Sequence, residues 1–204
     1  MIIRASEPPQ LDAHRIGTLF LQGFHGKFEH FGFTPTEARL SADLLGDYLL
    51  TFYAPSLIVA VPPKGGPLNG CLLLNQGQTL GQRTFKHRLG QVLPGWSGLK
   101  LLLFLQLLDQ PASPAQPVVD FIAVDPLTRH QGIGTALLRY CQAHTTQLTL
   151  NVAATNPTAH RLYYHLGFCD RQTQHSWLTQ RFLGFDQWTT MDWGNQKGPR
   201  DISR

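Results

Sequence analysis

Charged residues are scarce in this chain, at 15% of its 204 residues, whereas an ordinary soluble domain has about 25%. This scarcity argues against intrinsic disorder and against a long coiled coil, because both need many charged residues. Basic residues outnumber acidic ones by 17 to 13, which gives a formal net charge of +4. They are dispersed along the chain, so the excess suits a small anionic ligand, and we predict no nucleic-acid partner.

Cysteine is also rare. Cys71, Cys141 and Cys169 are an odd number at wide spacing and form no Cys-x-x-Cys pair. This pattern argues against a disulfide framework and against a thiolate zinc site, and it makes a reducing, cytoplasmic location the default. The nine histidines include no His-Glu-x-x-His motif, so we predict no metal site.

Long hydrophobic runs are missing as well. The most apolar stretch, Leu99 to Leu108, is interrupted by Lys100 and Gln106 and is far too short to span a bilayer. The first residues contain no apolar segment long enough for a signal peptide. We therefore predict no membrane partner. The Leu-rich stretch is interpreted as a buried helix or an interface helix, and it is compatible with a homodimer.

The amino-terminal quarter predicts two consecutive helices. Apolar residues recur at three- and four-residue intervals from Leu11 to Phe31, which is typical of one face of a helix. Thr34 then serves as a cap, with Pro35 at the first helical position and Glu37 three residues after the cap. This signal predicts a second helix that runs to about residue 50. The acidic residues of both helices, Glu37 among them, are expected on a solvated face.

Strand-like runs flank these helices. Residues 2–5 predict a short opening strand. The apolar runs 56–61 and 71–74, separated by a turn-rich segment, predict an antiparallel hairpin. Residues 76–117 hold basic and apolar segments that end at several prolines, and we interpret them as a helical insertion.

The remaining chain alternates strands and helices. The expected elements are a strand at 118–124, a helix at 132–144, a strand at 148–152, a helix capped by Asn156, and a closing strand at 182–193. We predict a single α/β domain over residues 1–194 with the insertion at about 76–117, followed by a polar tail at 195–204.

The clearest chemical signal lies between residues 124 and 136. A strand runs into a turn, then Arg129, then two glycines, Gly132 and Gly134, that open a helix. Glycines let the backbone approach a ligand closely, and a helix start offers unpaired N–H groups and the positive end of the helix dipole. The arrangement favours a phosphate or diphosphate, although a lone Gly-x-Gly also occurs in tight turns without a ligand.

Spacing excludes two other phosphate-binding loops. A P-loop needs Gly-Lys-Ser/Thr, whereas Gly134 is followed by Thr135 and Ala136. A dinucleotide-binding fingerprint needs a third small residue where Leu137 stands, and its first glycine comes directly after the strand.

Two motifs in order resemble one enzyme superfamily. Arg129-x-x-Gly132-x-Gly134 is similar to the acetyl-CoA signature of the GNAT N-acetyltransferases. The stretch from Asn156 to Phe168 resembles that family's Asn-x-x-Ala-x-x-Leu-Tyr-x-x-x-Gly-Phe pattern. The two motifs and the strands around them cover about residues 118–168.

The resemblance implies a mixed, mainly antiparallel sheet flanked by helices, whose fourth and fifth strands splay apart. It also implies acetyl-CoA as a co-substrate, with its pantetheine arm in the gap between those strands and its diphosphate on the loop amides. The residues implied in binding it are Ile122, Ala123, Val124, Arg129, His130, Gln131, Gly132, Ile133, Gly134, Thr135 and Asn156.

Acetyl transfer to an amine first requires that the amine lose a proton. An amine of pKa about 10.4 is neutral in only about one molecule in 10³ at pH 7, so a group must take that proton directly or through water. Asp120 lies two residues before Ile122 and four before Val124, so in a regular strand the three side chains point to the same face. Its carboxylate is therefore a candidate for the proton acceptor in the cleft. A cap or an ion pair near the start of the strand is an equal alternative.

The departing thiolate of CoA then needs a proton. Tyr163 matches the tyrosine that has this role in the family, and it shares a helical face with Ala159 and Leu162. A core aromatic residue with a satisfied hydroxyl is the alternative. Tyr164 is expected to point elsewhere.

The resemblance implies transfer of an acetyl group from acetyl-CoA to a primary amine of a small molecule or peptide, by direct attack in a ternary complex. Two alternatives stay open at this point. One is a CoA-binding regulatory module with weak or no catalysis, and the other is an acyltransferase that uses a longer acyl-CoA.

Overall fold

The computed structural model describes residues 1–5, 11–63, 65–78, 80–108, 112–113 and 115–194, so the tail expected at 195–204 lies outside the described residues. The strands form one sheet in the order β1-β2-β3-β4-β5-β7-β6. Neighbouring strands are antiparallel except β4 and β5, which are parallel. The strands are β1 (Ile2–Arg4), β2 (Leu57–Ala60), β3 (Gly70–Asn75), β4 (Val118–Val124), β5 (Leu148–Ala153), β6 (Cys169–His175) and β7 (Gln187–Trp193).

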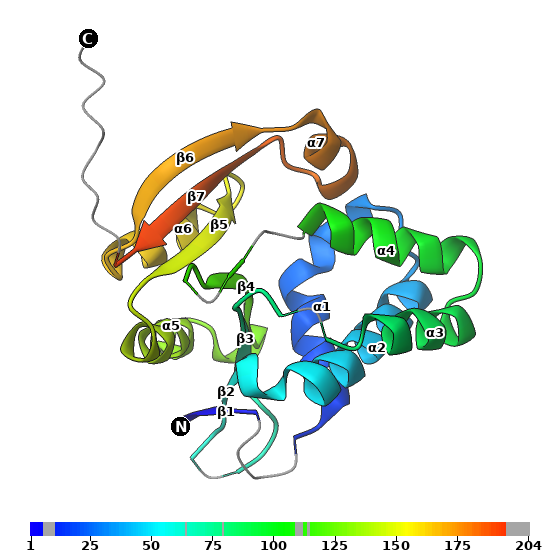
Figure 1. The fold of residues 1–204 in the computed structure, drawn as a ribbon, viewed down its shortest axis with the longest axis horizontal. Helices are drawn as coiled ribbons and strands as arrows, with labels where there is room; N and C mark the ends of the chain where they lie inside the picture. Colours follow the sequence, from blue (N-terminus) through cyan, green and yellow to red (C-terminus); the bar gives the residue numbers. More distant parts are fainter. Residues whose placement is uncertain (6–10, 64, 79, 109–111, 114, 195–204) are drawn as a thin grey trace.

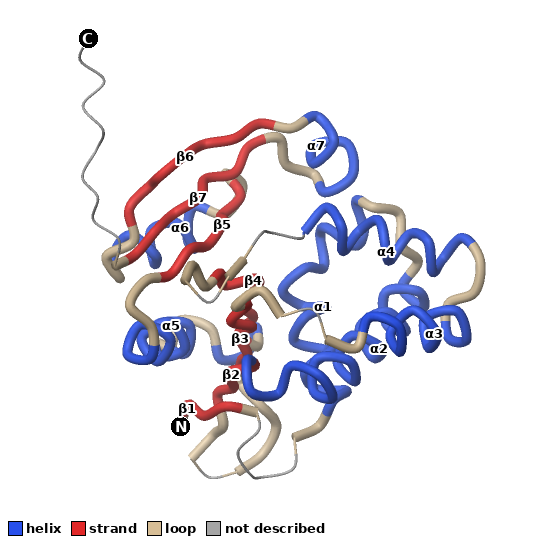
Figure 2. Tube along the Cα trace, viewed as in Figure 1, coloured by secondary structure: helices blue, strands red, loops and turns tan. Residues whose placement is uncertain are grey.

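Helices cover both faces of this sheet (Figure 1). Figure 2 shows α1 to α4 gathered on one side of the central strands, with α5 and α6 on the other. The segment 76–117 contributes α3 and α4, which confirms the helical insertion before the fourth strand. The helices are α1 (Ala13–His30), α2 (Pro35–Tyr53), α3 (Gln82–Val92), α4 (Trp96–Leu108), α5 (Ile133–His144), α6 (Pro157–His165) and α7 (Trp177–Leu183).

The central strands divide the core into two layers. In β2, Leu57 and Val59 pack with the α1–α4 layer, whereas Ile58 packs with the α5–α6 layer. This alternation follows from the two-residue period of a strand. On the α1–α4 side, the rings of Phe28 and Phe104 lie 4.5 Å apart, so α4 is joined to α1 through the core.

The Leu-rich segment forms α4. Leu101 and Phe104 are fully buried, whereas Trp96, Leu99 and Leu103 are exposed. One face of α4 therefore belongs to the core and the other lies at the surface. No helix within the described residues has both the length and the apolar character needed to cross a membrane.

The start of α2 follows its sequence signal. Thr34 Oγ1 accepts a hydrogen bond from Glu37 N at 3.2 Å, and the Glu37 carboxylate accepts one from Thr34 N at 2.8 Å. The expectation that Glu37 lies on a solvated face is wrong. Its carboxylate also accepts hydrogen bonds from Lys100 Nζ at 2.7 Å and from Ser97 Oγ, and its side chain is 17% exposed. The ion pair between Glu37 and Lys100 is largely buried and links α4 to α2.

We expect Glu37→Gln to lower the free energy of unfolding at pH 7 by roughly 1.5 kcal/mol, the contribution of a hydrogen bond to a charged group. The hydrogen bond from Lys100, more than the other contacts, lowers the pKa of Glu37 from 4.5 to about 2. Such a carboxyl group stabilises the fold above its unfolded pKa and loses that contribution as the pH falls toward the folded value.

In urea titrations of wild type and variant, the deficit of Glu37→Gln should therefore be constant from pH 7 to pH 5 and shrink below pH 4.5. A deficit that does not change with pH would contradict the ion-pair account.

The carboxy-terminal region differs from the single closing strand expected at 182–193. Residues 177–183 form α7, which the Ser176 side chain caps and which ends at Gly184, where φ is +79°. The closing strand β7 begins only at Gln187. The edge strand β6 is polar and exposed along most of its length, so its sequence shows no alternation of apolar and polar residues. Backbone pairing with β7 holds this segment in the sheet.

Candidate active site

β4 and β5 pair only where β4 begins. Among the described residues, the parallel register joins only Val118 and Val119 to β5. Beyond them β4 continues along β3, while β5 continues along β7. The strands thus splay apart, and the backbone of Ile122, Ala123 and Val124 has one edge toward the opening. An extended ligand that carries amide groups can pair with such an edge as an added strand.

Two residues in the left-handed region shape the loop after β4. His130 has φ of +63° and Gly132 has φ of +78°. Gly132 is the N-cap of α5 and makes no side-chain capping hydrogen bond to the first N–H groups of the helix. A Cβ at Gly132 would meet no atom within 4 Å, so the surface is open there. The amides of Ile133, Gly134 and Thr135 at this helix start can bind an anion.

Gly134 lies where α5 approaches the end of β4. A Cβ on this residue would lie 3.5 Å from Leu162 and 3.9 Å from both Ile122 and Val124. These are ordinary contacts for a methyl group, but a longer side chain would extend into the space between β4, α5 and α6. The missing side chain keeps that space accessible.

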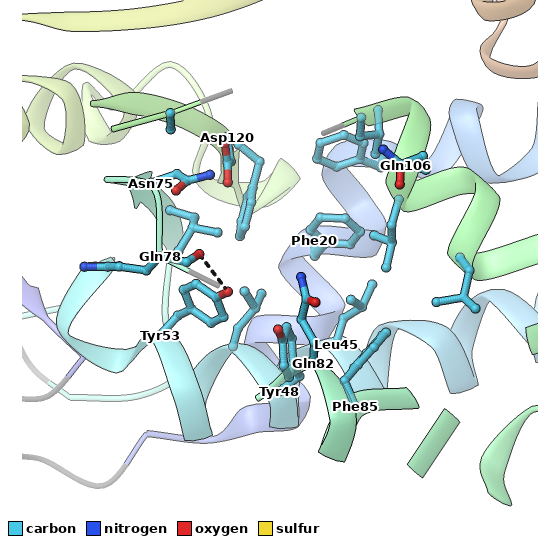
Figure 3. Close-up of a pocket in the computed structure, with 18 of the residues that line it drawn as sticks. Phe20, Leu45, Tyr48, Tyr53, Asn75, Gln78, Gln82, Phe85, Gln106 and Asp120 are labelled. Carbon is cyan, nitrogen blue, oxygen red and sulfur yellow. Dashed lines mark hydrogen bonds between the residues drawn. The ribbon is translucent and has the colours of Figure 1, made fainter. Parts of the chain in front are cut away.

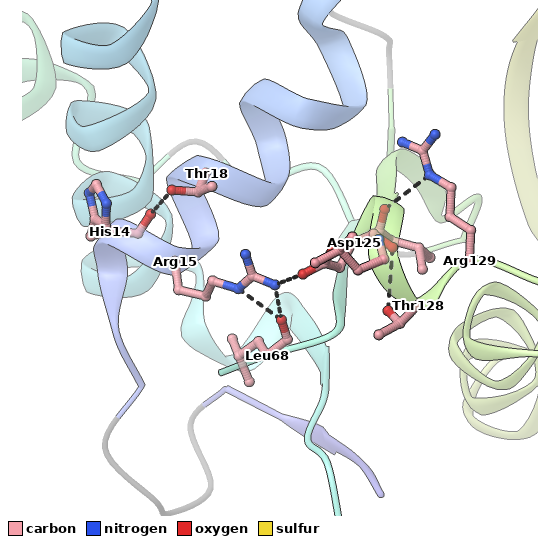
Figure 4. Close-up of polar contacts among 9 residues, drawn as sticks. His14, Arg15, Thr18, Leu68, Asp125, Thr128 and Arg129 are labelled. Carbon is pink, nitrogen blue, oxygen red and sulfur yellow. Dashed lines mark hydrogen bonds and ion pairs between the residues drawn. The ribbon is translucent and has the colours of Figure 1, made fainter. Parts of the chain in front are cut away.

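The polar residues of the loop are exposed. Arg129, His130 and Gln131 all lie at the surface. The Nε atom of Arg129 donates to the Val124 carbonyl at 3.4 Å (Figure 4), which holds the guanidinium beside the loop. Its remaining N–H groups can add a charge-assisted contact to an anion bound at the start of α5.

An ion pair stabilises the backbone at the end of β4. The Asp125 carboxylate pairs with the Arg15 guanidinium of α1, and both side chains are largely buried (Figure 4). Arg15 also donates to the Leu68 carbonyl at 2.9 and 2.7 Å. The hydrogen bond from the Leu127 amide, followed by that from Arg15, lowers the pKa of Asp125. Asp125 therefore stabilises the turn that follows β4. No local pattern in the sequence indicates the contact with Arg15, because 110 residues separate the partners.

A β-bulge turns Asp120 toward a cavity. The register of β3 and β4 shifts between Leu73 and Leu74, which lie opposite Phe121 and Val119, so that Asp120 is the extra residue. Strict alternation predicts Asp120 on the face of Ile122, but that expectation is wrong: Ile122 packs with the α5–α6 layer, whereas Asp120 lines the cavity with Phe121. A bulge changes the direction of side chains in this way.

The cavity has a volume of about 580 Å³ and lies between the sheet and α1 to α4. Figure 3 shows Asp120 and Asn75 entering it from the strands, with Tyr48, Gln82 and Phe85 on the opposite side. This volume is in the range of small-molecule sites, which are typically 300–1,000 Å³.

Tyr163 lies on the other side of the sheet. It is buried within the α5–α6 layer, and its ring centroid is 6.0 Å from that of Phe168. Burial raises the pKa of its hydroxyl to about 12, so this group keeps its proton at neutral pH. The structure therefore does not bring Tyr163 and Asp120 into one cavity; the opening between β4 and β5 lies between them.

Asn156 has a structural role at the start of α6. Its Oδ1 atom accepts a hydrogen bond from Ala159 N at 3.1 Å and caps the helix. This contact positions α6, and with it Tyr163. Within the part of the chain that the structure describes, no group of three histidine, cysteine or acidic residues is arranged to hold a metal ion.

Comparisons with known proteins point to one family. The model of the acetyltransferase (GNAT) domain matches residues 101–170, the segment that contains the β4 end, the glycine loop and α6. A search of curated protein sequences finds no match.

Solved structures share the fold. An N-acetyltransferase from Staphylococcus aureus Mu50 superposes with a TM-score of 0.62 at 16% identity, covering 95% of this chain and 100% of that one. A Corynebacterium glutamicum protein titled histone acetyltransferase HPA2 and related acetyltransferase gives 0.61 at 18% identity, covering 94% of each. The ribosomal-protein-S18-alanine N-acetyltransferase of Escherichia coli gives 0.54 at 16% identity, covering 100% of this chain and 99% of that one.

At such identities the structural likeness concerns the fold, and the family model supplies the link to the loop and to α6. With the splayed β4 and β5 and the glycine-bearing start of α5, these findings agree. Residues 101–170 match the GNAT acetyltransferase domain, and the chain has the fold of the GNAT acetyltransferase structures.

Proposed function

We propose that the protein transfers an acetyl group from acetyl-CoA to a primary amine, by direct attack in a ternary complex. One observation carries this proposal: the open backbone edge of β4 leads directly into the uncapped start of α5. The edge suits the amide groups of a pantetheine arm, and the helix start suits the diphosphate that follows them.

The proposed cofactor contacts are mostly made by the backbone. The residues 122–124 would pair with pantetheine, and the amides from Gln131 to Thr135 would hold the diphosphate with help from the Arg129 guanidinium. A backbone N–H at Val124 would polarise the carbonyl of the acetyl group. His130 and Asn156 would act indirectly, since His130 shapes the loop and Asn156 caps α6.

On the acceptor side, we assign the amine to the cavity that Asp120 lines. The carboxylate would attract the ammonium form and take up its proton, directly or through water. The amine nitrogen then attacks the acetyl carbonyl carbon, the new C–N bond forms, and the C–S bond of the thioester breaks. The electron pair leaves on sulfur, and Tyr163 would supply the proton that converts this thiolate to a thiol.

The cysteines favour direct attack over a covalent intermediate. Cys71 and Cys141 are buried, and burial raises the pKa of each thiol to about 12. A thiol with such a pKa is a poor nucleophile at neutral pH, because the thiolate is the reactive form. Cys169 is exposed on the edge strand β6.

Isothermal titration of the full chain with acetyl-CoA tests the proposal. We expect saturable binding, and we expect release of free CoA thiol when a primary amine is added. No binding at millimolar acetyl-CoA would refute the proposal. Binding without thiol release on any amine would instead favour a regulatory module. Faster release from a longer acyl-CoA would assign a different acyl donor.

A further inference from the structure

The last two turns of α1 pass over the opening between β4 and β5. At Gly23 the helix lies against β4, since a Cβ on Gly23 would be 3.2 Å from the Cβ of Ala123. At the end of the helix, Nε2 of His30 donates a hydrogen bond to the Gln180 carbonyl of α7 at 3.1 Å (Figure 1). The chain leads from α7 into β7, which pairs with β5. Thus α1 extends from one side of the opening to the other.

Lys27 lies in the part of α1 that spans the opening. It follows Gly23 by four residues, so both are on the helix face that meets β4. A helical side chain leans toward the start of its helix, and Nζ of Lys27 lies 4.4 Å from the ring centroid of Phe24 and 5.4 Å from that of Phe185. Phe24 lines the cavity of about 580 Å³, and Phe185 packs near Trp188 of β7. The amine therefore lies between that cavity and β7.

The surroundings of Lys27 favour its neutral form. Among the described residues, no carboxylate forms an ion pair with it. Attraction to the aromatic rings compensates only part of the lost hydration, and burial lowers the pKa of Lys27 from 10.5 to about 8. At pH 8 about half of the molecules therefore carry a neutral, nucleophilic amine there, against roughly one in 250 for an exposed lysine.

We propose that Lys27 is a site of self-acetylation, at which acetyl-CoA held along β4 transfers its acetyl group to Nζ of the same chain. Gly23 contacts Ala123, the residue before Val124, where the proposed function puts the acetyl carbonyl. Gly23 and Lys27 are one helical turn apart, a rise of about 6 Å. A lysine side chain that points back along the helix spans that length. This inference rests on the proposed function, because it needs the same bound acetyl-CoA.

The step needs no reactant besides acetyl-CoA. The neutral Nζ attacks the carbonyl carbon of the acetyl group, the C–N bond forms, and the C–S bond of the thioester breaks. The electron pair leaves on sulfur, and the proton that the nitrogen loses is returned to that thiolate. The products are acetyl-lysine and the CoA thiol. Acetylation removes the positive charge of the side chain, so the modified chain no longer has a cation between Phe24 and Phe185.

Incubation of the full chain with acetyl-CoA, without an added amine, tests the inference. At pH 8 we expect the intact mass to rise by one acetyl group and peptide mass spectrometry to place that group on Lys27. The first-order rate constant should saturate with acetyl-CoA at the Kd that titration gives. It should not change with protein concentration, since the reaction occurs within one chain. Lys86, which is exposed on α3, should react at least about tenfold more slowly.

A pair of variants identifies the amine that reacts. Lys27→Arg keeps a positive charge beside the same rings but stays protonated at pH 8, so it should not gain the acetyl group, while its Kd for acetyl-CoA stays unchanged. Lys86→Arg, the matched control, should gain the acetyl group as the wild type does. Peptide mapping of the wild type decides the question even where a variant does not fold.

The outcomes separate this inference from the proposed function. If acetyl-CoA binds and Lys27 stays unmodified, or reacts no faster than Lys86, self-acetylation is wrong and the transferase remains. A rate constant that rises with acetyl-CoA without saturation would indicate chemical acetylation from solution, and one that rises with protein concentration would indicate transfer between chains. Either result overturns the inference. Failure of titration to detect acetyl-CoA binding would remove the proposed function itself, and this inference with it.

Discussion

Gly134→Glu is expected to raise the Kd for acetyl-CoA at least about 100-fold, which corresponds to roughly 2.8 kcal/mol. The new side chain would extend from the first turn of α5 toward Leu162, Ile122 and Val124, and so into the space proposed for the ligand. Its carboxylate would also repel the diphosphate at the helix start. Isothermal titration of the purified variant measures the effect.

The same substitution is not expected to damage the fold. A glutamate in the first turn of a helix interacts favourably with the helix dipole, by about 0.3–1 kcal/mol, so the melting temperature should be maintained or rise. Gly90→Glu on the exposed surface of α3, where a Cβ would meet no atom within 4 Å, is the matched control and should bind acetyl-CoA normally. Normal binding by Gly134→Glu would show that the diphosphate does not lie at the start of α5.

Tyr163→Phe is expected to lower kcat by roughly 10- to 10³-fold, because a general acid is typically worth 10²–10⁴ in rate and water can replace part of it. The variant loses one oxygen atom and keeps the buried ring that packs near Phe168. The Kd for acetyl-CoA should therefore change little. Steady-state kinetics together with titration separates the two constants.

The pH dependence gives Tyr163 a second readout. Burial raises the pKa of its hydroxyl to about 12, so the protonated form that serves as an acid persists well above pH 10. We expect no loss of wild-type kcat from this group between pH 8 and pH 10. Tyr164→Phe is the matched control, since Tyr164 is adjacent and 67% exposed, and it should behave as wild type. A normal kcat in Tyr163→Phe would assign the acid to another group or to water.

The two proposed catalytic side chains lie on opposite faces of the sheet. Asp120 belongs to the α1–α4 side and Tyr163 to the α5–α6 side, with the opening between β4 and β5 between them. A thioester placed in that opening would have the amine on one side and the proton donor on the other. In this proposal, the splay of the two strands would allow groups from both layers to act on one bond.

Local signals were enough to predict much of this molecule. The capping box at Thr34, the proline and cap at the start of α6, and the glycines before α5 each act within a few residues, and hydrogen bonds along the chain enforce them. The order of strands and helices as far as α6 could be predicted for the same reason. The motif that indicated acetyl-CoA is local as well, because the site proposed for its diphosphate consists of one turn and one helix start.

Other features depend on residues that are distant in the chain. Arg15 meets Asp125 because α1 packs against the end of β4, and Glu37 meets Lys100 because α2 and α4 lie on the same side of the sheet (Figure 2). The bulge that turns Asp120 into the cavity arises from the register between β3 and β4, and the polar strand β6 exists because β7 offers backbone groups to pair. Periodicity in a sequence records which face of an element is apolar. It does not record which partner covers that face, and here the partner shapes the cavity that Asp120 lines.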